Sequence, residues 1–147
     1  MTDVTGPRPM VLRPGDGREL PLIGRLQASG TDTAGTFELI EVTGPSTPPP
    51  HVHKEHDEIF VVLTGSFQFL LDRETAEALP GTVAVVPRGW RHGFTMEPGS
   101  TALLLAIPAG LGDYFKELGA ALAEGRPGLS ARSELTGKYD FYPDQHA

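Results

Sequence analysis

Two histidines and a nearby carboxylate are the residues whose types and spacing best suit chemistry. His51 and His53 are separated by one residue. In a β-strand, both side chains would point to the same face, with Cα atoms roughly 6.5–7 Å apart. Glu58 opens a second strand-like run, EIFVVLTG, in which Glu58, Phe60 and Val62 share one face. If that face meets the two histidines, two imidazoles and a carboxylate surround one point, and a metal ion is the usual reason for such a pair.

A third imidazole comes from the segment 81–96, GTVAVVPRGWRHGFTM. Its pattern predicts an apolar strand, a turn at Pro87-Arg88-Gly89, and a second strand that carries His92. Three neutral imidazoles and one carboxylate would leave a divalent ion with a net charge of about +1 and with open positions for a substrate. Nitrogen and oxygen ligands without a thiolate suit one divalent transition metal per subunit, with Fe, Mn, Ni, Co, Cu and Zn all open.

These two segments resemble the two sequence motifs of the cupin family. The first motif, G-x5/6-H-x-H-x3/4-E-x6-G, is matched by Gly44, His51, His53, Glu58 and Gly65. The second, G-x5-P-x-G-x2-H-x3-N, is matched by Gly81, Pro87, Gly89 and His92, whereas Met96 stands at its final Asn. Within the cupins, the chain is most similar to small single-domain proteins that resemble quercetin 2,3-dioxygenase.

The resemblance implies an all-β fold, the cupin double-stranded β-helix or jelly-roll barrel, followed by a C-terminal α-helix. One domain is expected over residues 1–147, with the barrel at about 10–108 and a helical and aromatic tail at 109–147. The resemblance also implies that Glu58 is both a metal ligand and the catalytic general base, and that two subunits pair through edge strands as a homodimer. The implied metal ligands are His51, His53, Glu58 and His92.

Hydrophobic patterning is consistent with this fold. Short apolar runs separated by glycine and proline predict many strands. The predicted strands are Met10–Leu12, Ile23–Ala28, Phe37–Thr43, Phe67–Leu71, Val83–Val86, Gly93–Met96 and Ala102–Ile107. The polar stretch Asp72–Glu77 is expected to be a hairpin loop. A stripe of apolar residues at helical spacing predicts a helix at Leu111–Ala123, and Ser130 is expected to cap a short helix at Ala131–Thr136.

The neighbours of the histidines suggest an apolar substrate pocket, and several assignments stay open. The candidate lining residues are Phe60, Val62, Phe94 and Met96, although plain barrel core is the favoured interpretation for any one of them taken alone. His56 is expected to be a solvent-exposed loop residue, with an alternative ligand or a supporting role near the ligands as the other possibilities. The side chain of Asp57 should point away from that of Glu58. The helix at Leu111–Ala123 is expected to pack its apolar stripe on the outer face of the barrel or on a partner subunit. The alternative is a lid role, in which Tyr139, Phe141 and Tyr142 close the mouth of the pocket.

Composition excludes some functions. The 147 residues carry 12 Lys and Arg against 19 Asp and Glu, which gives a formal net charge of −7. An acidic chain without a basic run is a poor partner for nucleic acid or anionic membranes. There is no cysteine, so disulfides and thiolate sites are excluded. Without a signal-like or membrane-spanning apolar run, a cytoplasmic location is expected.

Together these features predict a metal-dependent enzyme that acts on a small oxygenated compound, aromatic or enolisable, by dioxygenation of the quercetinase type. A second hypothesis uses the same metal as a Lewis acid for cyclisation or isomerisation of a polyketide-like enol, without oxygen. A third, from a different class, is a binding module in which the metal only anchors a small molecule.

Overall fold

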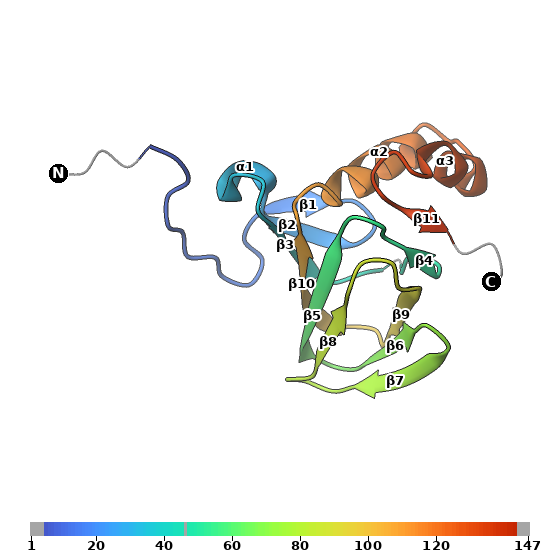
Figure 1. The fold of residues 1–147 in the computed structure, drawn as a ribbon, viewed down its shortest axis with the longest axis horizontal. Helices are drawn as coiled ribbons and strands as arrows, with labels where there is room; N and C mark the ends of the chain where they lie inside the picture. The colour runs from blue at the N-terminus through green and yellow to red at the C-terminus, as the bar shows by residue number, and fades with distance from the viewer. Residues whose placement is uncertain (1–4, 46, 144–147) are drawn as a thin grey trace.

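A computed structural model describes residues 5–45 and 47–143 of the chain. Alternating strands build two antiparallel sheets, and three helices are added to them (Figure 1). The first half contains β1 Arg18–Leu20, β2 Gly24–Ala28, α1 Gly30–Thr33, β3 Glu38–Val42, β4 His51–Val52, β5 Asp57–Thr64 and β6 Phe67–Leu71. The second half contains β7 Glu74–Ala78, β8 Val83–Val86, β9 His92–Met96, β10 Thr101–Ile107, α2 Gly112–Ala123, α3 Gly128–Leu135 and β11 Tyr142–Pro143.

The two sheets face each other as the halves of a jelly roll. One has six strands in the order β1-β2-β3-β10-β5-β8, and the other has five in the order β11-β4-β9-β6-β7. The chain passes repeatedly from one sheet to the other, so strands that are distant in sequence become neighbours. Strand β10, for example, pairs with β3 on one side and with β5 on the other. The expected all-β cupin fold with a C-terminal helix is confirmed.

Period-two alternation decides which side chains enter the core. On β5, Glu58, Phe60 and Val62 are at most 5% exposed, whereas Leu63 on the other face is 40% exposed. Opposite them, Phe69 and Phe94 lie 5.1 Å and 5.5 Å from the Phe60 ring, measured between centroids. Aromatic rings at these separations and angles pack favourably beyond their simple burial. The interior of the barrel therefore contains a cluster of phenylalanine rings, and Glu58 is buried on the same face of β5 as Phe60.

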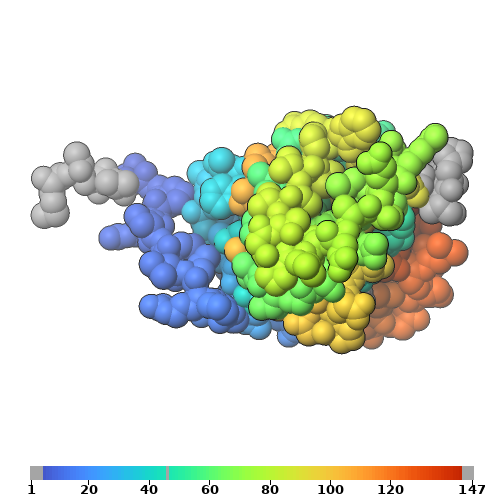
Figure 2. Space-filling model, turned by 90° about the horizontal axis from the view of Figure 1, so that it is seen from below, coloured from blue at the N-terminus to red at the C-terminus, as the bar shows by residue number. Residues whose placement is uncertain are grey.

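Several predicted elements differ from the structure. Residues 10–12 form no strand: they lie in an N-terminal segment with prolines on both sides, and Val11 is 77% exposed. The stretch expected to be a loop, Asp72–Glu77, is a two-residue turn followed by β7. Its apolar pattern is missing because β7 is the edge of its sheet and only Ala78 is buried. Figure 2 shows the N-terminal segment, in dark blue, at one side of the body and the late helices on the other.

The two C-terminal helices lie at one end of the sandwich (Figure 1). The predicted stripe is confirmed, since Tyr114, Phe115 and Leu118 of α2 are buried. We expected α2 to pack on the outside of the barrel or on a partner, but Phe115 reaches the interior cavity. Helix α3 begins at Gly128, before the expected start, and its N-cap residue is Pro127. The predicted capping role of Ser130 is therefore wrong.

A buried carboxylate anchors the start of α2. Glu38 of β3 is 3% exposed, and its Oε1 accepts a 2.7 Å hydrogen bond from the backbone N–H of Gly112. The residue at the N-cap position, Leu111, has no side chain that could accept such a bond. Glu38 therefore caps the helix from a strand and holds it over the end of the barrel. Within the described residues, no helix combines the length and apolarity needed to cross a membrane.

Candidate metal centre

The structure brings together the four side chains that the motifs predict as ligands. One ligand atom from each lies within 4.8 Å of the ligand atoms of the other three. All four residues are buried, with 2–5% of their surface exposed. The four are His51, His53, Glu58 and His92.

Both sheets contribute to this cluster. His51 on β4 and His92 on β9 occupy directly paired positions of the five-stranded sheet. His53 lies just after β4, so the expected strand ends one residue before it. Glu58 comes from β5 of the opposite sheet and points inward between the two sheets. The cluster therefore exists only when the sheets are closed on each other.

Backbone carbonyl groups orient the three imidazole rings. The Nδ1 atom of His51 lies 2.7 Å from the Pro49 oxygen, and that of His92 lies 2.9 Å from the Trp90 oxygen. The Nδ1 atom of His53 lies 2.7 Å from the Asp140 oxygen. A carbonyl oxygen can only accept, so each Nδ1 carries hydrogen and donates it. The three Nε2 atoms are thereby left to face the centre, as the ligating atoms of metal-bound histidines do.

The distances at the centre match those between neighbouring ligands of a single ion. His51 Nε2 and His53 Nε2 are 3.2 Å apart, His53 Nε2 is 3.0 Å from Glu58 Oε1, and His92 Nε2 is 3.1 Å from Glu58 Oε2. Ligands about 2.1 Å from an ion and at right angles to each other lie about 3.0 Å apart. Lone pairs this close repel one another unless a proton or a cation lies between them. The residues present therefore fit one divalent metal ion.

The charge states of the four side chains also fit a bound cation. Burial and the neighbouring His92 and His53 lower the pKa of His51 far below its ordinary value, so this ring is neutral. Burial alone would raise the pKa of Glu58, but His53 and His92 outweigh burial and hold that pKa well below its usual range. Burial works to lower the pKa of His53, yet Glu58 raises it overall. An ionised carboxylate among imidazoles is the charge state that a cation requires.

His56 does not behave as expected. Its side chain is only 11% exposed, and its Nδ1 donates to Asp140 Oδ2 over 2.7 Å. The expectation of a solvent-exposed loop histidine is wrong, because the C-terminal segment covers the loop. His56 does not join the cluster, and its ring lies 6.4 Å from that of His53, centroid to centroid. Asp57 points outward as predicted and pairs with Arg88.

A small cavity adjoins the cluster. Of the four predicted lining residues, Phe60 and Phe94 line it, but Val62 and Met96 do not. Val62 lies deeper in the core, with 1% exposure, and Met96 packs against that core from its edge. The free space is about 10 Å³, room for roughly one water molecule. The other lining residues are Ile23, Ile40, Pro48, Leu104, Leu111, Phe115 and Phe141.

Sequence reasoning left open the part played by the residues after the barrel. Leu111 at the N-cap of α2, Phe115 within α2 and Phe141 from the tail all line the cavity. The ring of Phe141 stacks on that of His51 with 4.0 Å between centroids. A run of aromatic residues in the tail was the only signal in the sequence, and it did not show which ring would reach the centre.

Comparison with known proteins gives the family. A family model described as a cupin domain matches residues 38–108. Quercetin 2,3-dioxygenase of Bacillus subtilis (strain 168) is 34% identical over 102 residues, which are 65% of this chain and 30% of that enzyme. The chain thus spans about 30% of the length of this curated relative.

Two solved structures have the same fold at recognisable identity. The polyketide cyclase RemF from Streptomyces resistomycificus is 31% identical, with a TM-score of 0.53 over 69% of this chain and 79% of RemF. KdgF from Halomonas sp. is 28% identical, with a TM-score of 0.51 over 57% of this chain and 76% of KdgF. With its two motifs, its two-sheet barrel and its buried group of three histidines and a glutamate, this chain belongs to the cupin family, as a small cupin that resembles quercetin 2,3-dioxygenase.

Proposed function

We propose that the protein is a metal-dependent dioxygenase of the quercetinase type, acting on a small aromatic or enolisable oxygenated compound. The observation that carries this proposal is the position of the buried three-histidine, one-glutamate cluster at the end of an apolar, aromatic-lined cavity. The identity to the Bacillus quercetin 2,3-dioxygenase supports this choice of reaction.

The metal would be held by the Nε2 atoms of the three histidines and the carboxylate of Glu58. When bound, such an ion lowers the pKa of a hydroxyl group that coordinates it and stabilises the resulting anion. Glu58 is the only carboxylate in the cluster, so it is the group that accepts the hydroxyl proton. Its low pKa keeps the carboxylate ionised and available, and makes it a weak base that removes a proton only from an acidified hydroxyl.

The cavity walls would serve this chemistry by orienting an apolar ring and excluding water. Phe60 and Phe94 line the cavity together with the cluster, and no lining residue outside the cluster carries a charge. A pocket for a drug-sized ligand needs about 300–1,000 Å³, far more than the space present. Phe115 and Phe141, which line the cavity from the C-terminal segment, would therefore have to move before such a substrate binds.

Oxygen dependence tests this proposal directly. Protein loaded in turn with Fe, Mn, Ni, Co, Cu or Zn should convert a flavonol such as quercetin in air, and turnover should stop in the absence of oxygen. Oxygen uptake should match substrate loss. Turnover that continues unchanged without oxygen would reject dioxygenation.

A second candidate is a non-oxidative cyclisation or isomerisation of a polyketide-like enol. The observation that favours it is the match to RemF, which extends over 79% of that polyketide cyclase, whereas the chain covers 30% of the Bacillus dioxygenase. Glu58 would again take the hydroxyl proton, and the apolar walls would hold the folded chain. Product formed from a polyketide-like enol with no oxygen uptake would select this candidate. Tight binding of these compounds without product would instead indicate a binding module.

A further inference from the structure

The chain returns to the barrel after its two helices. Residues 137–143, here called the C-terminal strap, run back along β4, and β11 pairs Tyr142 with Val52 and Pro143 with His51. Figure 1 shows this segment descending from the helices to β11, which lies beside β4. The strap lies outside the residues that the cupin family model matches, 38–108.

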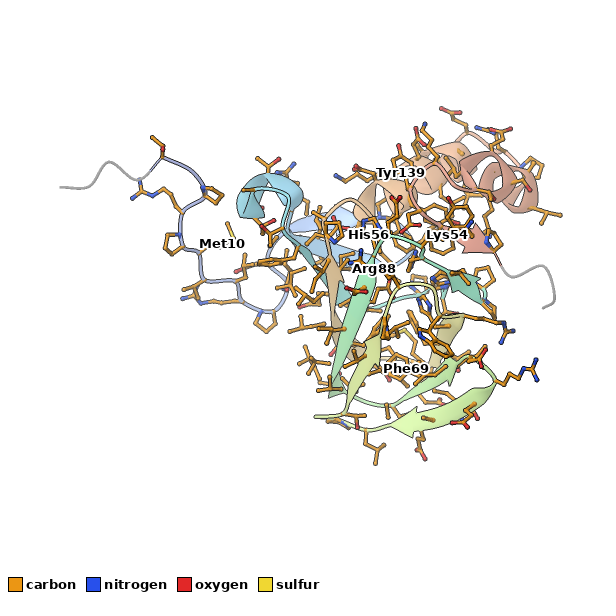
Figure 3. The ribbon with its side chains drawn as sticks, in the orientation of Figure 1. Met10, Lys54, His56, Phe69, Arg88 and Tyr139 are labelled. Atoms are coloured by element: carbon orange, nitrogen blue, oxygen red, sulfur yellow. The ribbon has the colours of Figure 1, made fainter. Side chains whose placement is uncertain are left out.

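The carboxylate of Asp140 in this strap organises the loop between the ligands. Its Oδ1 accepts from the backbone N–H of Lys54 and its Oδ2 from that of Glu55, each over 2.7 Å. Its Oδ2 also accepts from His56 Nδ1 over 2.7 Å. Residues 54–56 join His53 to the strand that carries Glu58. Figure 3 labels Lys54, His56 and Tyr139 where this loop meets the strap.

The backbone of the same residue holds a ligand directly. The carbonyl oxygen of Asp140 accepts the Nδ1 hydrogen of His53 over 2.7 Å, which fixes the ring with Nε2 toward the cluster. The next residue, Phe141, stacks on His51. Asp140 has a φ of +60°, a left-handed conformation that points its carboxylate and its carbonyl at the same loop.

Asp140 is 7% exposed, so its charge must be balanced within the protein. Burial raises the pKa of its carboxyl, but the hydrogen bonds from His56 and from the backbone of Glu55 and Lys54 lower that pKa overall. The bonds therefore hold an ionised carboxylate beside the loop. Charge-assisted bonds of this kind are about twice as strong as neutral ones.

We propose that Asp140 is a positioning residue of the metal centre: it fixes the ring of His53 and the loop 54–56, and so sets metal affinity and geometry. This inference rests on the metal centre of the proposed function. Groups that orient metal ligands through hydrogen bonds typically change metal affinity by about 10–100-fold when they are removed. The centre of this protein would then depend on a segment outside the matched cupin domain.

Cobalt titration of the metal-free full chain tests this role, because Co²⁺ reports both affinity and ligand geometry through its visible absorption. Asp140→Ala keeps the backbone carbonyl that bonds to His53 but removes the carboxylate bonds that hold this carbonyl and the loop in place. It should therefore bind Co²⁺ about 10–100-fold more weakly than the unmodified protein, with an altered spectrum. The matched control is Glu117→Gln. Glu117 holds the same strap through an exposed ion pair with Lys138 but touches neither the loop nor a ligand. This control should bind Co²⁺ with unchanged affinity and spectrum.

A second variant covers the case in which Asp140→Ala fails to fold. Asp140→Asn keeps the size of the side chain and one oxygen acceptor, so it should fold and lose part of the affinity. Wild-type affinity and spectrum in both variants would overturn the inference. Loss of fold in both, with Glu117→Gln folded, would overturn it too, because Asp140 would then support the fold as a whole.

The experiment distinguishes failure of this inference from failure of the proposed function. Co²⁺ binding needs no substrate, so a protein that binds Co²⁺ through an Asp140-dependent site but turns over neither flavonol nor enol retains this inference and loses the proposed function. Turnover of a flavonol together with unchanged Co²⁺ binding in Asp140→Ala and Asp140→Asn would overturn the inference and support the proposed function. A wild-type chain that binds no Co²⁺ at all would overturn the inference.

Discussion

His51 on β4 and His92 on β9 are directly paired across the five-stranded sheet, and their ring centroids are 4.4 Å apart. This pairing brings the two sequence motifs together, because β4 carries a histidine of the first motif and β9 carries the histidine of the second. Glu58 reaches the same cluster from β5 of the facing sheet. The predictions for Glu58 and His51 depend on this convergence.

Replacing Glu58 by Gln should abolish turnover while leaving much of the metal bound. The three imidazoles remain, and an amide oxygen can still coordinate, but an amide cannot accept the substrate proton. Metal analysis and activity on the same sample provide the measurement. Asp57→Asn is the neighbouring control, since that carboxylate points outward to Arg88 and should leave both values unchanged. Full activity in Glu58→Gln would exclude its role as the base.

Metal should stabilise the folded protein, and His51→Ala should remove most of this effect. A ligand that binds only the folded state adds about 2.7 kcal/mol to the free energy of unfolding at one hundred times its Kd. His51 is 2% exposed and lies at the point where the other ligand atoms converge. Thermal unfolding with and without a divalent metal should show a rise in Tm for the natural chain and a much smaller one for the variant. Equal rises would show that the metal binds elsewhere.

The thermal stability of the Glu38→Gln variant, compared with that of the natural chain, should rise as the pH increases from 4 to 7. Burial raises the pKa of Glu38 above its ordinary value of 4.5, although the backbone N–H groups of Gly112 and Gly110 lower it in part. A group whose pKa is raised by folding stabilises the protein fully below its unfolded pKa, and this contribution is lost as pH rises through the folded pKa. The difference in Tm between variant and natural chain should therefore grow with pH.

A companion variant separates charge from capping at the same position. Glu38→Leu leaves the N–H of Gly112 without its acceptor at the start of α2, so it should lower Tm at every pH. A Tm difference for Glu38→Gln that stays constant between pH 4 and 7 would contradict the assignment of a raised pKa.

Gly65→Ala should lower the free energy of unfolding by about 1–3 kcal/mol, the typical cost of one strained backbone position, or by more. Gly65 has a φ of +72°, and an added Cβ would lie 2.8 Å from the Cα of Ser100. The side chain of Ser100 cannot move away freely because its Oγ bonds to both the N–H and the carbonyl of Ser66. Denaturant unfolding measures the loss. Gly99→Ala is a useful contrast, since its φ is also positive, +80°, but nothing lies within 4 Å of the added Cβ.

Much of the candidate site could be predicted from local pattern. The spacing of His51 and His53, and the separation of Glu58 from Asp57 onto opposite faces, follow from the two-residue period of a strand, which involves only neighbouring residues. The same period placed Phe60 beside the cluster. It could not tell which residues of a buried face lie next to the cavity, and so Val62 was assigned to the lining although it lies deeper in the core.

Only the tertiary structure decided how the chain after residue 108 takes part. Asp140 bonds to His53 across 87 positions of sequence, and Glu38 bonds to Gly112 across 74. Contacts over such distances depend on where the helices dock and how the sheets close, and no local period encodes them. For this reason the amino-acid pattern identified the ligands and their chemistry, whereas the packed fold determined what orients them, what covers His56 and which C-terminal residues line the cavity.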